Sequence, residues 1–323
     1  MRKIVSFLAA TALAGIAWSA QALTWDMPTP YGETNFHTVN IKQFAEDVEA
    51  ATEGALTIKV HSAGSLFKHP EIKNAVRGGQ VPVGEFLLSR LANENAVFQV
   101  DSIPFLATSY EDARRLWRAS RPLVEKLLAE EGLQVLFSVP WPPQGLYAKK
   151  AVDSTEDLKG LKFRAYNTAT ERLAELAGAV PTQVEVPDIP QAFATGRVEA
   201  MITSPSTGAN TKAWDFVSHF HHTQAWLPKN IVVVNKRAFD RLDPDIQEAV
   251  LAAAAQAEDR GWEMSTEETA AKIEILREHG MTIHNPPSRR LMKGLKDIGS
   301  KMTADWAERA GDDGQAILEA YRQ

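Results

Sequence analysis

One arginine stands at the end of a short apolar segment, and its position indicates contact with an anionic ligand. Residues 161–163 read as a strand, Arg164 follows directly, and a helical pattern occupies residues 169–178. A guanidinium can form two parallel hydrogen bonds with a carboxylate, which a lysine ammonium cannot do. On this segment alone, a surface arginine and a carboxylate-binding arginine are equally good interpretations. Ligands of open α/β sheets bind at the carboxyl ends of strands, which favours the second.

Polar and aromatic residues in other segments could complete a binding site around Arg164. The strand-like segment 199–204 also ends in hydroxyl residues. A stiff proline loop, 139–147, carries an indole, an amide and a phenol, although aromatic packing at a hinge explains that loop equally well. The segment 223–230 adds another indole, a lysine and an asparagine. The predicted ligand contacts are Arg164, Thr203, Ser204, Trp141, Gln144, Tyr147, Trp226, Lys229 and Asn230, together with Asn167 and Glu85.

The sequence carries none of the motifs that would indicate an enzyme. It lacks a glycine-rich phosphate loop, a G-x-S-x-G elbow and an H-E-x-x-H pattern. The densest histidine group, His219, His221 and His222, has no spacing that converges on a metal ion. We therefore expect no catalytic residue, no cofactor and no metal. An exported hydrolase or lyase acting on a small carboxylic acid in the same cleft is the alternative hypothesis.

The first 22 residues predict export. Arg2 and Lys3 precede the apolar stretch 4–16, and Ala20-Gln21-Ala22 matches a signal-peptide cleavage site, so we expect cleavage after Ala22. The net charge of −6 argues against nucleic acid or an anionic membrane surface as the partner. No later segment is apolar over the length that a membrane helix needs. These features predict a periplasmic protein that is not itself embedded in the membrane.

The rest of the chain predicts an α/β protein with two lobes. Its 323 residues exceed what one hydrophobic core usually supports. Strand and helix patterns alternate in the first third, which predicts a largely parallel sheet there, and they alternate again over residues 133–204, where residues 181–186 read as one of the strands. The apolar run 230–236 is typical of a fully buried strand, and long helices follow it.

No flexible linker separates the two halves, so the chain is expected to cross between the lobes more than once. That connectivity is typical of a hinged clamshell that closes around a ligand. The predicted division assigns residues 23–141 and 230–269 to lobe I, and residues 142–229 and 270–297 to lobe II. Residues 298–323 are predicted to form a C-terminal helix that packs on the lobes.

Several segments, in order, resemble the solute-binding subunits of tripartite ATP-independent periplasmic (TRAP) transporters, the DctP family. They are FAEDVEAATEGALTIKVHSAGSL, DSIPFLATSYEDARRLW, DLKGLKFRAYNTATERLAELAGAVPTQVEV, VEAMITSPSTG and NIVVVNKRAFDRLDPDIQEAV. The resemblance covers nearly all of residues 23–323. It implies a periplasmic-binding-protein-like fold and a receptor that delivers a small organic carboxylate to membrane permease subunits. It also implies that Arg164, in the G-L-K-x-R motif, forms the bidentate salt bridge with the ligand carboxylate.

Departures from the family pattern narrow the expected ligand. Gln144 stands where sialic-acid-type members carry a second arginine, which disfavours a dianionic ligand. Ser204 stands where the family often has an asparagine, and the acidic-aromatic motif of cation-assisted keto-acid members is missing. We therefore expect a monocarboxylate with an apolar, aromatic or hydroxylated body. Lys229 could supply a second cation, which keeps sugar acids among the candidates.

Overall fold

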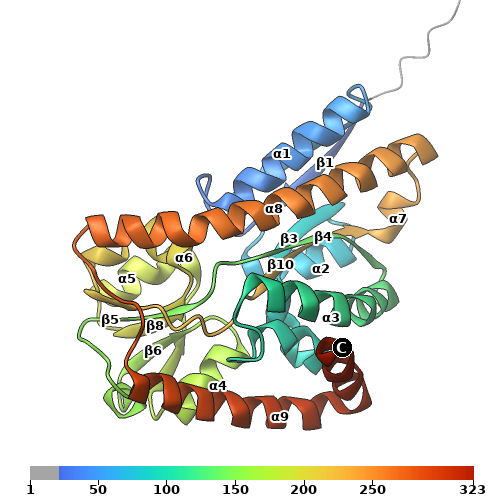
Figure 1. Ribbon diagram of the computed structural model, residues 1–323. Helices are drawn as coiled ribbons and strands as arrows, with labels where there is room; N and C mark the ends of the chain where they lie inside the picture. The colour runs from blue at the N-terminus through green and yellow to red at the C-terminus, as the bar shows by residue number, and fades with distance from the viewer. Residues whose placement is uncertain (1–21) are drawn as a thin grey trace, which may run out of the picture.

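The computed structural model describes residues 22–323 as a two-lobed α/β protein (Figure 1). The predicted signal peptide lies outside the described residues except for Ala22, so its cleavage stays a prediction. Within residues 22–323, no helix combines the length and the apolar character needed to cross a membrane.

The first lobe contains two small sheets. Strands β1 (Leu23–Pro28) and β2 (Leu56–His61) pair in parallel. Strands β3 (Val83–Leu87), β10 (Lys229–Asn235) and β4 (Leu133–Pro140) form the second sheet, with β10 in the centre and antiparallel to both neighbours. The prediction of a largely parallel sheet holds for β1 and β2 but is wrong for the three-stranded sheet, because β10 comes from much later in the sequence and lies antiparallel between β3 and β4.

The central position of β10 explains its apolar sequence. All seven of its residues are buried. Burying the side chains of Ile231 and Val232 to Val234 stabilises the lobe by about 1.5–3 kcal/mol each. The prediction of a fully buried strand in this segment is therefore confirmed.

The second lobe is built on one six-stranded sheet with the order β11-β9-β5-β8-β6-β7. Strand β6 runs parallel to β7 and β8, whereas β5 runs antiparallel to β8 and β9. The carboxyl ends of β6, β7 and β8 therefore meet at one edge of the sheet. The strand bounds are β5 (Gly145–Ala148), β6 (Lys162–Ala165), β7 (Val180–Gln183), β8 (Ala200–Thr203), β9 (His219–His221) and β11 (Thr282–His284).

Short and medium helices cover these sheets. In the first lobe they are α1 (Phe36–Ala51), α2 (Ile72–Arg77), α3 (Tyr110–Glu130) and α7 (Lys236–Phe239), with 3-10 turns at His69–Glu71, Leu88–Asn93 and Ala96–Ser102. In the second lobe they are α4 (Thr168–Leu176), α5 (Ile189–Ala194) and α6 (Pro205–Asn210), with 3-10 turns at Thr155–Leu158, Val186–Asp188 and Ala213–Asp215.

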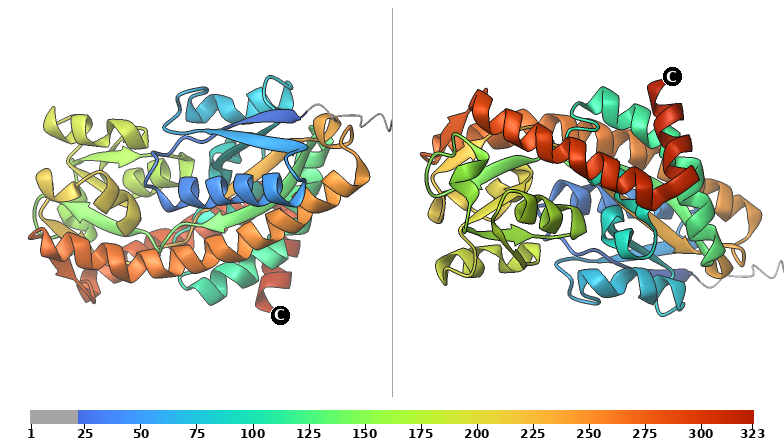
Figure 2. Two further views of the ribbon diagram at one scale, coloured as in Figure 1. Left: turned by 90° about the horizontal axis from the view of Figure 1, so that it is seen from above. Right: turned by 90° about the horizontal axis from the view of Figure 1, so that it is seen from below.

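Two long helices connect the lobes on opposite sides of the molecule (Figures 1 and 2). Helix α8 (Pro244–Glu278) packs on α1 and β4 of the first lobe and on α6 of the second. Helix α9 (Arg289–Arg322) contacts both α3 and α4. The predicted lobe boundaries at 269/270 and 297/298 fall within these helices, so the residue-by-residue division into lobes stays a prediction.

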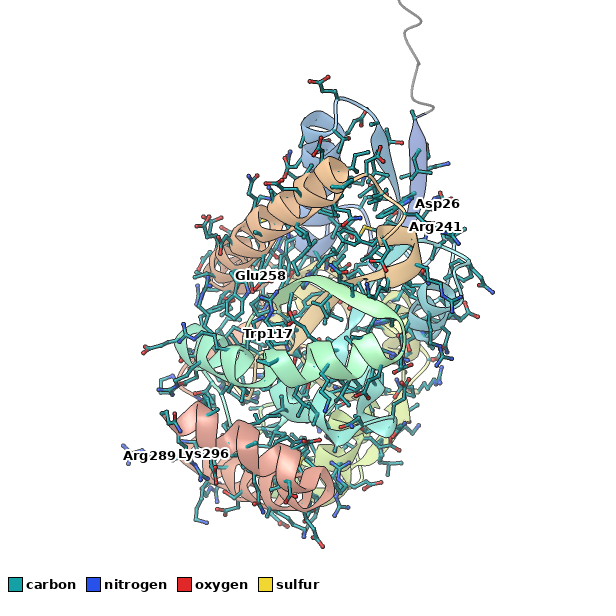
Figure 3. The ribbon with its side chains drawn as sticks, turned by 90° about the vertical axis from the view of Figure 1, so that its right-hand side faces the viewer. Asp26, Trp117, Arg241, Glu258, Arg289 and Lys296 are labelled. Carbon is teal, nitrogen blue, oxygen red and sulfur yellow. The ribbon has the colours of Figure 1, made fainter. Side chains whose placement is uncertain are left out.

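Glu258 fixes α8 to the first lobe. Figure 3 shows Glu258 of α8 near Trp117 of α3. The Glu258 carboxylate accepts hydrogen bonds from Arg121 Nη1 at 3.0 Å and from the Ser138 N–H at 3.1 Å. Three residues further along α8, a Cβ at Gly261 would lie 2.4 Å from Val139, so glycine allows the helix to cross β4 at close range. These contacts fix the position of α8 relative to α3 and β4.

Candidate ligand-binding site

A cavity lies between the two lobes. The first lobe lines it with Tyr31, His69, Leu87 and Arg90, and the second lobe with Arg164, Tyr166, Glu185, Val186, Thr203, Ser204 and Thr207. The crossing segments between the lobes add Trp141, Gln144 and Pro228.

The two crossing segments run side by side at the base of this cavity. The Trp141 N–H donates to Pro228 O at 2.8 Å, and the Gln144 N–H donates to Trp226 O at 2.9 Å. These backbone bonds make a short two-stranded connection where β4 passes into β5 and β9 passes into β10. The connection lies where hinge motion of the lobes would have its axis.

The Arg164 side chain is anchored through its Nε, whereas its two terminal nitrogens, at the tip of the side chain, are unpaired. It is 1 % exposed, its Nε donates to Val184 O at 2.9 Å, and its guanidinium carbon lies 4.9 Å from the centre of the Tyr166 ring. Within residues 22–323, its Nη1 and Nη2 have no hydrogen-bond or carboxylate partner. Burial lowers the pKa of Arg164 to about 10, so the side chain remains charged at neutral pH. An unpaired guanidinium in a small cavity is suited to bind a carboxylate in the bidentate manner.

A chain of hydrogen bonds holds Tyr166 against this guanidinium. The Trp226 Nε1 donates to the Tyr166 hydroxyl at 3.1 Å, and that hydroxyl donates to Gln144 Oε1 at 3.1 Å. The Gln144 Nε2 in turn donates to Pro142 O at 2.9 Å. Trp226 is 1 % exposed and does not line the cavity, so it acts from behind by fixing the Tyr166 ring.

A second buried network holds the aromatic wall formed by Tyr31 and Trp141. Asn230 Oδ1 accepts from the Tyr31 hydroxyl at 3.1 Å and from the Trp141 Nε1 at 2.9 Å, and its Nδ2 donates to Glu85 at 3.0 Å. Burial alone would raise the pKa of Glu85, but the nearby His37 and the hydrogen bonds that Glu85 accepts keep it below its usual value. Glu85 and Asn230 therefore lie behind the cavity wall and orient its two rings.

The hydroxyl side of the cavity is formed by Thr203 and Ser204 at the end of β8. Ser204 begins α6, and its Oγ accepts from the Thr207 N–H at 2.9 Å. Tyr147 supports this turn from beneath, because its hydroxyl donates to Ser204 O at 3.1 Å. A Cβ at Gly208 would lie 2.2 Å from the same hydroxyl, so only glycine fits there. Tyr147 is fully buried and does not line the cavity.

Glu185 joins the lobes through Arg90 and His69. Arg90 Nη1 lies 2.9 Å from Glu185 Oε1 and also donates to Tyr166 O at 3.1 Å. His69 Nδ1 lies 3.6 Å from Glu185 Oε2, and His69 Nε2 accepts from the Leu87 N–H at 3.1 Å. Because Nε2 is an acceptor, Nδ1 carries the ring proton and points its donor at the carboxylate.

The charge states of this group follow from its surroundings. Burial alone would raise the pKa of Glu185, but the His69 contact and the Arg90 charge lower it to about 2. Burial lowers the pKa of His69. At neutral pH the group therefore consists of a carboxylate, a guanidinium and a neutral imidazole.

Lys229 and Asn167 lie outside the cavity lining. Lys229 is 1 % exposed, its Nζ is 3.5 Å from Asp101 Oδ2, and it lies 5.8 Å from the centre of the Trp117 ring. The second cation that lines the cavity is Arg90 and not Lys229. Lys229 therefore gives no reason to expect a sugar acid as the ligand. Asn167 caps α4 and donates from Nδ2 to Ser89 Oγ across the lobes at 2.8 Å.

Sequence reasoning missed several residues of the cavity. Glu185 follows the end of β7, beside Arg164 in the parallel sheet, so the strand-end argument applies to it too. Tyr166 is two residues beyond Arg164 and Thr207 is in the helix that begins after Ser204, so both had a local signal. No pattern in the sequence distinguished the others, which are Tyr31, His69, Leu87, Arg90, Val186 and Pro228.

The histidine group lies at the β11-β9 edge of the six-stranded sheet, outside the cavity lining. His219 Nδ1 is 3.0 Å from His284 Nε2, and His221 stacks on His284 with ring centres 4.1 Å apart. Burial, with the neighbouring His284 and His219, lowers the pKa of His221 to about 4. In the part of the chain that the structure describes, no group of three or more metal-binding side chains is placed to hold an ion.

Comparison with known proteins agrees with this geometry. Residues 30–305 match the model of bacterial extracellular solute-binding protein family 7, DctP. The chain is similar to DctP6 of Bordetella pertussis, an extracytoplasmic solute receptor binding pyroglutamic acid, with 46% identity, a TM-score of 0.91, and coverage of 93% of this chain and 99% of that one. It is also similar to a marine metagenome TRAP solute-binding protein specific for pyroglutamate, with 44% identity, a TM-score of 0.91, and coverage of 94% and 99%.

A more distant relative is the C4-dicarboxylate-binding periplasmic protein DctP of Rhodobacter capsulatus, 24% identical over 86% of this chain and 84% of that protein. The resemblance to TRAP solute-binding subunits and the expectation of a two-lobed receptor fold are thus confirmed. The chain belongs to bacterial extracellular solute-binding protein family 7, the DctP family of TRAP-transporter receptors.

Proposed function

We propose that this protein binds pyroglutamate, or a cyclic monocarboxylate of closely similar size, in the cavity between its lobes. The observation that carries the proposal is the unpaired tip of Arg164, which lines the cavity and is positioned by Val184 O and the Tyr166 ring. Closure of the lobes removes water from the guanidinium and the ligand carboxylate, which strengthens their attraction. The pyroglutamate ligands of two relatives at 44–46% identity support the choice of acid.

The lining of the cavity suits a compact ring. Tyr31 and Trp141 offer flat apolar surfaces, and Thr203, Ser204 and Thr207 offer small polar groups from the second lobe. Longer sugar acids carry several hydroxyl groups, each of which needs a hydrogen-bond partner when buried. The side chain of Gln144 already bonds to Tyr166 and Pro142, which leaves few amide groups for such a ligand.

We further propose that the protein acts in the periplasm after cleavage at Ala22 and passes its ligand to the membrane permease subunits of a TRAP transporter. The family role supports this. The alternative of a hydrolase or lyase has less support, because Ser204 Oγ caps a helix and His69 is engaged by Leu87 and Glu185. Within residues 22–323 these two side chains do not pair as a nucleophile and base.

A thermal-shift screen tests the proposal. The protein, unfolded and refolded to remove bound acids, would be melted with pyroglutamate, glucuronate, gulonate, succinate and proline, each also tested on Arg164→Ala. A ligand at a hundredfold excess over Kd stabilises the folded state by about 2.7 kcal/mol. We expect the largest shift with pyroglutamate and none with Arg164→Ala. A larger shift with a sugar acid or with succinate would contradict the proposed ligand.

A further inference from the structure

Glu185 places a fixed negative charge on the wall of a cavity that otherwise attracts anions. It lines the same cavity as Arg164, and the two are adjacent through the backbone, because Val184 O accepts from Arg164 Nε. Both residues line the cavity, and no ion pair within 4.0 Å joins their side chains in the described part of the chain. A ligand carboxylate on Arg164 therefore lies near a second carboxylate that belongs to the protein.

The partners of Glu185 leave it able to accept another hydrogen bond. An ionised carboxylate has about four acceptor positions. Arg90 Nη1 at 2.9 Å occupies one of these, and His69 Nδ1 at 3.6 Å makes a long contact with a second. Both partners are donors and come from the first lobe, so they hold the carboxylate in place without using all of its acceptor positions.

The charges of the lining limit which ligands fit. Two arginines, one glutamate and a neutral histidine leave a single positive charge, which one ligand carboxylate neutralises. A second carboxylate would be repelled by Glu185. A ligand ammonium would leave the positive charge of the cavity uncompensated. A neutral N–H is the donor that satisfies Glu185 without changing this balance, since an unpaired buried charge is costly.

We propose that Glu185 is the residue that selects a neutral N–H next to the ligand carboxylate, and so distinguishes lactam and amide acids from dicarboxylates and free amino acids. This inference rests on the proposed function, since it concerns the same cavity. It assigns to Glu185 the recognition of the ring nitrogen and to Arg164 the recognition of the carboxylate.

The test compares two ligands that differ at one atom. Pyroglutamate and its lactone analogue, 5-oxotetrahydrofuran-2-carboxylate, share the ring and the carboxylate, but the lactone has oxygen in place of N–H. Isothermal titration would give Kd for both ligands on the parent protein and on Glu185→Gln. A hydrogen bond to a charged group corresponds to roughly 10- to 150-fold in affinity. We expect the parent to prefer the lactam at least tenfold and Glu185→Gln to prefer it less than threefold.

Ser89→Ala is the matched control, because it removes the interlobe hydrogen bond from Asn167 without touching Glu185. It should weaken both ligands equally and keep the parent's preference for the lactam. A preference of Glu185→Gln as large as that of the parent, or equal binding of lactam and lactone by the parent, would overturn the role of Glu185 and leave the proposed function intact. If the parent binds neither but binds another acid, the proposed ligand itself is wrong.

Discussion

Replacing Arg164 by lysine separates a bidentate clamp from a simple positive charge. Each hydrogen bond to a charged group contributes about 1.5–3 kcal/mol. Lysine keeps the charge but cannot offer two parallel donors in one plane. We therefore expect Arg164→Lys to lose about one such bond, which raises Kd roughly 10- to 150-fold.

Alanine at the same position removes the charge as well. The ligand carboxylate would then be buried without a counter-charge, at a cost of about 3–5 kcal/mol. The corresponding rise in Kd is roughly 100- to 4,000-fold. We therefore expect Kd to rise in the order parent, Arg164→Lys, Arg164→Ala. The intermediate value for lysine depends on the planar geometry of the guanidinium.

Isothermal titration with pyroglutamate on unfolded and refolded protein would measure these values. Arg172→Lys is the matched control, because Arg172 lies on α4 of the same lobe with a side chain that is 44% exposed and pairs with Glu175. It should leave Kd within about twofold of the parent, since exposed ion pairs contribute about 0–1 kcal/mol. Near-parental affinity in Arg164→Lys, or less than a tenfold loss in Arg164→Ala, would refute the bidentate clamp.

Three further predictions concern the scaffold of the site. Gly208→Ala places a Cβ 2.2 Å from the Tyr147 hydroxyl and should lower the free energy of unfolding by about 1–3 kcal/mol in urea titration, whereas no loss would show that this turn can move. Asn230→Leu leaves two buried donors on the aromatic wall without an acceptor and should cost about 2–6 kcal/mol of stability while also weakening ligand binding, so unchanged affinity would contradict its positioning role. The pKa of His221 in the folded protein, about 4, is below its usual value of 6.5, so the unfolded state binds this proton more tightly. Stability should therefore be complete above pH 6.5 and fall as the pH drops toward 4, with a smaller fall in His221→Gln.

The part of the site that is local in sequence could be predicted, because residues at the carboxyl ends of strands gather at one edge of a sheet. Arg164 is the third of the four residues of β6, within the strand and not directly after it as predicted, and Ser204 directly follows β8, so a short segment carries enough information to place both near the edge of the sheet in the second lobe. Glu185 meets the same condition, but the sequence predicts a strand over 181–186 whereas β7 ends at Gln183. Because the predicted strand ended three residues too late, Glu185 was assigned to the strand and was not recognised as a residue of the cavity.

The other residues in and around the cavity are positioned by contacts between distant parts of the chain, which a local sequence pattern cannot predict. The hydroxyl of Tyr31 bonds to Asn230, 199 residues away in the chain. Lys229 pairs with Asp101, 128 residues earlier, and this removes it from the cavity. The insertion of β10 between β3 and β4 is likewise a long-range pairing, which is why a largely parallel sheet was predicted for the first lobe although β10 runs antiparallel to both of its neighbours.

The most direct test of the central claim is a crystal structure of the protein grown with pyroglutamate. We predict that the ligand carboxylate lies in the cavity between the lobes and accepts two hydrogen bonds from Arg164 Nη1 and Nη2, at about 2.7–2.9 Å each. A ligand bound with its carboxylate away from Arg164, or bound outside this cavity, would contradict the account.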